Sequence, residues 1–130
     1  MNARRTSAAA LVATVAASVA VGVATPAYAK GGGDAVRTSK ACSTGVLKLK
    51  AKHDDGRIEA EVEVDTNRNG QRWAVRILDN NVTAWKGART TLAPSGSFSI
   101  EKRIANKAGT DVIKVRVARG KTVCTASVSL

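Results

Sequence analysis

Aromatic side chains, histidine and cysteine are scarce in this 130-residue sequence, which holds two Trp, one Tyr, one Phe, one His and two Cys. A single imidazole leaves no second histidine to activate a serine, and no serine stands in a nucleophile-elbow pattern. So few rings also disfavour modules that stack nucleic-acid bases or sugars on several exposed aromatics. We therefore expect a non-catalytic protein and do not expect nucleic acid as its partner.

Acidic residues are also few, because 10 Asp and Glu face 21 Lys and Arg, for a formal net charge of +11. Two of the arginines and none of the acids fall in residues 1–29. The rest of the chain is too polar to span a bilayer and has enough apolar residues for one modest core. These proportions exclude an integral membrane protein and a multidomain enzyme.

Residues 1–29 have the three parts of a secretory signal peptide. Arg4 and Arg5 supply the positive start, residues 8–24 are small and apolar, and the segment ends at Ala29 in the small-x-small pattern that signal peptidase reads. We expect cleavage after Ala29 and therefore a secreted, extracellular protein.

The two cysteines stand near the two ends of the expected domain, residues 42–130. Outside the cell an even cysteine count indicates a disulfide, and here only Cys42 to Cys124 is possible. Closing a loop of about 80 residues is worth roughly 4 to 5 kcal/mol in the chain-entropy model. Residues 30–41, rich in Gly, Lys and Ser without periodicity, predict a flexible leader ahead of this domain.

From residue 45 onward apolar and polar residues alternate with a period of two, and no stretch keeps a helical period. The alternation predicts seven short strands separated by turn-forming residues. They cover residues 46–52, 57–64, 72–78, 82–86, 97–101, 111–117 and 123–128. Seven strands at this spacing predict an all-β, antiparallel sandwich.

The first two strands are expected to form a hairpin through a four-residue turn at residues 53–56. This register places Lys50 opposite Glu59 and Leu49 opposite Ala60, so that apolar residues share one face and charged residues the other. The charged face is nearly balanced in sign. The excess of positive charge must therefore lie elsewhere.

Three features resemble a compact immunoglobulin-like sandwich: an inward Trp73 on the third strand, a Gly109-x-Asp111 corner before the sixth strand, and a core-facing seventh strand. The chain from Cys42 onward is also similar to small secreted actinobacterial proteins with no assigned activity. This likeness depends on Cys42, residues 54–59, residues 64–67, Trp73, residues 79–80, residues 95–98, residues 108–111 and Cys124. The resemblance implies an immunoglobulin-like fold and export, and it implies no functional site.

In an immunoglobulin-like topology the third and sixth strands are neighbours, which would gather outward basic residues on one sheet face. The residues concerned are Arg72, Arg76, Lys114 and Arg116, with Lys86, Arg89 and Lys121 as possible rim residues. Such a face attracts polyanions, and outside a cell these include anionic cell-wall polymers and acidic proteins. The alternative is that the positive charge only keeps a secreted monomer soluble.

Trp85 is the remaining candidate in this group. If it faced outward, the guanidinium of Arg76 could lie over its ring and mark the ligand contact. The favoured alternative is that Trp85 packs in the core beneath an edge strand, because a buried Trp contributes a large apolar area.

Two motifs suggest other chemistry and are interpreted here as turns. Residues 65–70 match the start of an EF-hand calcium loop, but position twelve, which needs a bidentate acid, is Arg76. His53 is followed by Asp54 and Asp55 on an expected hairpin tip, where no cleft surrounds it. We expect no catalytic residue, no bound metal and no cofactor.

Two further functions remain open. A small-molecule carrier, resembling secreted chromoprotein sandwiches that hold a ligand between loops, would need a cleft with exposed apolar residues. A protease inhibitor would need a rigid exposed loop, for which residues 90–96 with Pro94 are the candidate.

Overall fold

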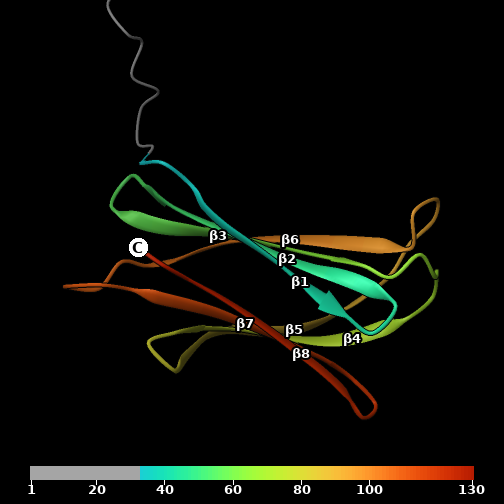
Figure 1. Cartoon of the computed structure of the whole chain (residues 1–130). Coiled ribbons are helices and arrows are strands. Elements are labelled where there is room, and N and C mark those ends of the chain that lie inside the picture. The colour runs from blue at the N-terminus through green and yellow to red at the C-terminus, as the bar shows by residue number, and fades with distance from the viewer. Residues whose placement is uncertain (1–32) are drawn as a thin grey trace, which may run out of the picture.

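The computed structural model describes residues 33–130 as two antiparallel sheets packed face to face (Figure 1). The strands are β1 (Val36–Cys42), β2 (Gly45–Asp54), β3 (Arg57–Asp65), β4 (Arg72–Asp79), β5 (Val82–Thr90), β6 (Ser97–Ala105), β7 (Val112–Arg119) and β8 (Thr122–Ser129). The predicted all-β sandwich is confirmed, with eight strands in place of seven. The expected signal peptide lies outside the described residues. No helix that is long and apolar enough to cross a membrane occurs in the described part.

The strand order is β1-β2-β3-β6 in one sheet, here the first sheet, and β5-β4-β7-β8 in the other, the second sheet. The expected neighbours, the third and sixth predicted strands, are β4 and β7, and they pair directly. At one side of the sandwich β1 lies against β8, and at the other side β5 lies against β6. Each sheet is therefore open to solvent on one face and covered by its partner on the other.

Side chains that alternate along every strand fill the space between the sheets. Trp73, Val75 and Ile77 of β4 point inward and are buried, as the alternation predicts. Phe98, Ile100 and Ile104 of β6 are also buried. The core therefore follows directly from the period-two pattern.

Residues expected to form a flexible leader contribute instead a strand, β1, at the edge of the first sheet. β1 pairs with β2 along its whole length, with Thr38 opposite Leu49 and Cys42 opposite Gly45. Alternation did not predict this strand, because Arg37, Ser39 and Lys40 do not alternate with apolar residues. An edge strand tolerates such polar residues, since it is only partly covered. The folded domain begins at β1, ahead of Cys42.

The register of the β2–β3 hairpin differs from the expected one by two residues. Lys50 lies opposite Glu61, and the turn is the two-residue pair Asp55 and Gly56, both with positive φ (48° and 74°). A shift of two residues keeps every side chain on its face, so alternation could not detect the error. Charge could have done so, because the expected register set Lys52 opposite Arg57, whereas Lys52 pairs with Glu59.

The predicted disulfide is confirmed. Cys42 at the end of β1 is bonded to Cys124 in β8, with a Cα–Cα distance of 5.7 Å. The bond joins the two sheets at the side where β1 and β8 meet. It thereby connects the first strand of the described domain to the last.

Candidate anion-binding face

The outer face of the second sheet carries basic side chains on three adjacent strands. Arg76 of β4 lies opposite Arg116 of β7 and opposite Lys86 of β5, so these three residues form one row across the sheet. Arg72 lies on the same face four residues before Arg76, and Lys114 lies two residues before Arg116. We call these five residues the basic face.

A hollow of about 440 Å³ lies within the basic face and is lined by Arg72, Arg76, Lys86 and Arg116. Small side chains between the long ones explain it, because Ala74 lies opposite Ala88 beneath the basic groups. Its rim is therefore positively charged and its floor is apolar.

No carboxylate among residues 33–130 lies within 4.0 Å of a basic-face nitrogen, since the five ion pairs all involve other cations. Lys114 donates a hydrogen bond to Asn81 Oδ1 at 3.3 Å. Like charges directly opposite each other destabilise a sheet, so the row of Lys86, Arg76 and Arg116 costs folding free energy. A bound anion would relieve that repulsion.

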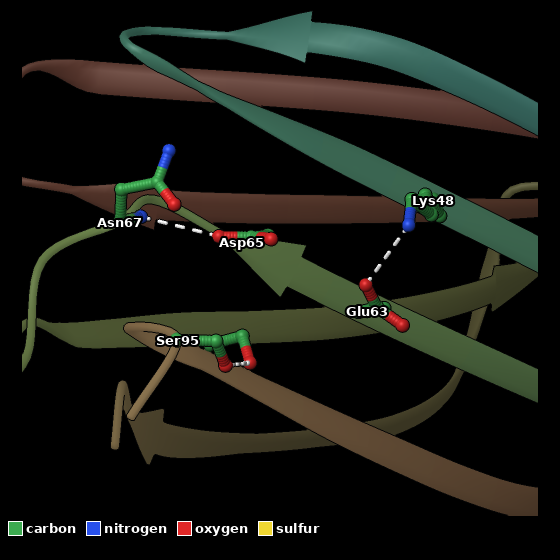
Figure 2. A network of polar contacts seen from close by, with 6 residues as sticks. Lys48, Glu63, Asp65, Asn67 and Ser95 are labelled. Carbon is green, nitrogen blue, oxygen red and sulfur yellow. Dashed lines mark hydrogen bonds and ion pairs between the residues drawn. The ribbon is translucent and has the colours of Figure 1, made fainter. Parts of the chain in front are cut away.

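The outer face of the first sheet has the opposite character. Over its described strands, six basic and six acidic side chains point outward: Arg37, Lys48, Lys50, Lys52, Arg57 and Arg103, and Asp54, Glu59, Glu61, Glu63, Asp65 and Glu101. Lys48 pairs with Glu63 at 3.0 Å (Figure 2), and Lys50 pairs with Glu61 at 2.7 Å. A hollow of about 440 Å³ also lies here, but among the charges that line it only Arg37 has no ion-pair partner within residues 33–130. Sign and pairing of charge, not shape, distinguish the two faces.

Trp85 is not part of the basic face. It lies opposite Ile77, on the inward side of β5, where its half-buried ring packs against the core at the edge. The ring packs against the core, as the favoured alternative predicts, and Arg76 does not lie over it. The cations above it are Lys102 Nζ, 5.0 Å from the ring centroid, and Arg89 Cζ, at 5.4 Å. Arg89 is therefore also absent from the basic face.

An irregularity in the pairing of β4 with β5 explains why alternation left Trp85 undecided. Ile77 pairs with Trp85, but Leu78 pairs with Thr83, so Ala84 is an extra residue in β5. Because of this extra residue, the alternation of inward and outward side chains in β5 changes phase at the bulge, and a single period-two pattern cannot describe the whole strand. The ring then lies over Gly87, where a Cβ atom would approach two ring carbons to 2.7 Å.

Of the other two candidate motifs, the calcium-like segment forms a turn, whereas His53 and Asp54, expected in a hairpin turn, are the last two residues of β2. Asp65 Oδ1 accepts a hydrogen bond from the Asn67 backbone N–H at 3.2 Å (Figure 2), as in an Asx turn. No group of three or more His, Cys, Asp or Glu side chains that could hold a metal occurs in residues 33–130. His53 Nδ1 lies 3.4 Å from Asn106 Nδ2, while Asp54 pairs with Arg103 at 3.5 Å.

The loop between β5 and β6 is short and held at both ends. Thr91 is buried, and Leu92 forms an isolated bridge with Ser97 across the turn. Gly96 donates its backbone N–H to the Leu92 carbonyl at 2.8 Å. The inhibitor candidate, residues 90–96, therefore presents Leu92 as its exposed apolar side chain.

Two buried carboxyl groups, those of Asp79 and Asp111, were missed by the sequence analysis. Their four oxygens are buried and have no hydrogen-bond partner among the described residues, and Lys107 Nζ lies 3.9 Å from Asp79 Oδ2. Burial first, and the charge of Asp111 second, raise the pKa of Asp79 above its usual 3.8, while Lys107 opposes the shift. The phase of β4 could have indicated this burial, because Asp79 continues the inward series of Val75 and Ile77.

Comparisons of the chain with family models, with curated proteins and with solved structures found no match. The charges, hollows and buried groups of the molecule itself are therefore what indicate a function.

Proposed function

We propose that this protein is a secreted, non-catalytic monomer that binds an anionic cell-wall polymer reversibly through the basic face. One observation carries the proposal: five cations that have no ion-pair partner within residues 33–130 gather on one sheet face, while the opposite face is balanced in sign. A surface of one sign concentrates and orients polyanions. Neutralising the cations releases counterions, which makes such binding strong at low salt and weak at high salt.

The spacing of the basic face suits a thin, flexible chain. Neighbouring strands lie about 4.8 Å apart, so the row of Lys86, Arg76 and Arg116 spans about 10 Å. Arg72 and Arg76 are about 13 Å apart along β4, four residues at the usual strand rise of about 3.3 Å. A linear polymer that lies in the hollow meets several of these cations at once, whereas a folded acidic protein would contact mainly the rim.

Two further observations support the compartment and the architecture. The Cys42–Cys124 disulfide is typical of proteins that fold in an oxidising environment, in agreement with the expected signal peptide. The adjacency of β4 and β7 supports the expected immunoglobulin-like topology.

Sedimentation with isolated cell walls tests the proposal. We expect the protein to sediment at about 50 mM salt with walls that carry phosphate polymer, and to remain in solution when that polymer has been extracted or when salt is high. Binding that survives both treatments would contradict an electrostatic mechanism. Retention by an acidic protein and not by the polymer would assign the basic face to the other class of partner.

A further inference from the structure

A second, smaller pocket lies at one end of the sandwich, where three turns meet. Its volume is about 200 Å³, and its wall includes Ser43 from the β1–β2 turn, Arg68 and Gln71 from the β3–β4 loop, and Arg119 and Thr122 beside the β7–β8 turn. None of these residues belongs to the basic face. The pocket is therefore a separate feature.

Trp73 forms part of the wall and supplies the observation that points to a ligand. Its side chain is only 2% exposed, yet its indole N–H has no hydrogen-bond acceptor among the described residues. A buried donor without an acceptor destabilises the fold, and such groups are few in native proteins. Because the indole nitrogen is itself buried, a ligand oxygen in the pocket reaches it only after a small displacement of the pocket wall, and would then satisfy it.

Every polar side chain around Trp73 can donate a hydrogen bond, and none is a carboxylate. Neither Arg68 nor Arg119 forms an ion pair or a side-chain hydrogen bond within residues 33–130. Ser43 and Thr122 add hydroxyl groups, and neither hydroxyl forms a hydrogen bond to another side chain or backbone group within residues 33–130. A wall of two guanidinium groups and one indole N–H, without a carboxylate, matches a ligand that accepts hydrogen bonds and carries negative charge.

The backbone around the pocket is fixed before any ligand binds. On one side Thr66 donates its N–H to Gly96 O at 3.0 Å, and Gly70 donates to Thr91 O at 2.8 Å. A Cβ on Gly96 would collide with the backbone of Arg68, so only glycine permits this close approach. On the other side the disulfide of Cys42 holds the β1–β2 turn beside β8. Both arginines are thus presented from constrained segments, as preorganised binding requires.

We propose that this end pocket, formed by Arg68, Arg119 and Trp73, binds one oxyanion group of a small molecule, either a phosphate or a carboxylate. The two guanidinium groups hold the charge, and the indole N–H of Trp73 donates to one oxygen. A volume of 200 Å³ equals that of about six or seven water molecules, so the site takes a small molecule and not a polymer chain. This site is independent of the polymer binding proposed for the basic face.

Titration of the ¹⁵N-labelled secreted chain, followed by NMR of the indole N–H groups, tests the proposal. Inorganic phosphate, sulfate and acetate are the probes, and the Trp85 indole is an internal control because it lies at another edge of the molecule. We expect a saturable shift of the Trp73 resonance and none for Trp85. Saturation by phosphate or sulfate alone assigns a phosphoryl-type ligand, and saturation by acetate alone assigns a carboxylate.

Variants separate this site from the basic face. R68Q/R119Q should raise the dissociation constant at least tenfold for each arginine removed, as expected for charge-assisted hydrogen bonds. R119K, which keeps the charge and loses the planar fork, should bind more weakly but still saturate. R76Q/R116Q should leave the titration unchanged, even if polymer binding is lost.

Two results would overturn the proposal. One is a Trp73 resonance that does not move with any of the three anions up to about 50 mM, where even weak binding is visible. The other is an equal response in R68Q/R119Q, because the shift would then not depend on the arginines. Well-dispersed spectra of both double variants ensure that neither result reflects unfolding.

Discussion

Replacing Arg76 and Arg116 by glutamine is the sharpest test of the basic face. The double variant removes two of the five charges, and glutamine keeps part of each side chain's volume. Neither arginine has an ion pair or a side-chain hydrogen bond within residues 33–130, so the fold loses no polar contact. Relief of the repulsion between the two guanidinium groups should raise stability by a few tenths of a kcal/mol.

The expected magnitude follows from the number of cations. Each phosphate contact on a flexible strand contributes about −0.7 to the slope of log K against log salt, so five contacts give about −3.5 and three give about −2. Between about 50 and 200 mM salt, the parent protein should therefore lose roughly 100-fold in affinity and the variant roughly 20-fold. The two slopes are far enough apart to be measured.

Fluorescence anisotropy of a labelled poly(glycerol phosphate) chain provides the assay. R37Q/R57Q is the matched control, since it removes the same two charges from the balanced outer face of the first sheet. We expect R37Q/R57Q to keep the parent slope. If both double variants lower the slope equally, then net charge and not the basic face drives binding, and the reasoning is refuted.

Three further predictions concern stability. Because the pKa of Asp79 is raised, its protonation stabilises the fold below about pH 3.8, and this contribution is lost as the pH rises through the folded-state pKa. In urea denaturation at pH 7, D79N should therefore be more stable than the parent by on the order of 1 kcal/mol. At pH 4 this advantage should be smaller. A loss of stability at pH 7 would contradict the prediction. Replacing Cys42 and Cys124 by alanine should lower the free energy of unfolding by about 4 to 5 kcal/mol, measured in guanidinium, and a loss below about 1 kcal/mol would show that the disulfide contributes little. G87A should push the Trp85 ring outward, red-shift the tryptophan emission and lower the free energy of unfolding by about 1 to 2 kcal/mol. Unchanged emission would mean that the position of the ring does not depend on this glycine.

Much of the fold could be predicted because alternation is a local property of the chain. The inward series Trp73, Val75 and Ile77 follows from neighbours two residues apart, and so does the outward position of Arg76. The pairing of the cysteines also followed, because two cysteines allow one bridge. With the neighbour relation of β4 and β7 added, four of the five basic-face residues could be named, and the fifth, Lys86, was expected only at the rim.

Tertiary structure alone decided the features that depend on distant segments. The two-residue shift in the β2–β3 register is invisible to alternation, because side chains return to the same face every second residue. The bulge at Ala84, which turns Trp85 inward, depends on how β5 meets β4. β1 is a strand because β2 offers it an edge and a disulfide fixes its end.

The sequence by itself therefore determined that the chain forms strands, which face most of its residues take, and where the one covalent link lies. Only the folded molecule decided that Arg68, Arg119 and Trp73 meet at one end, because the β3–β4 loop, the start of β4 and the end of β7 must converge to bring them together. It also decided that the outward-facing acidic residues of the described strands lie on the first sheet and not on the outer face of the second. The physical reason is that periodicity sets the direction of a side chain, whereas its neighbours are set by the closure of the whole sandwich.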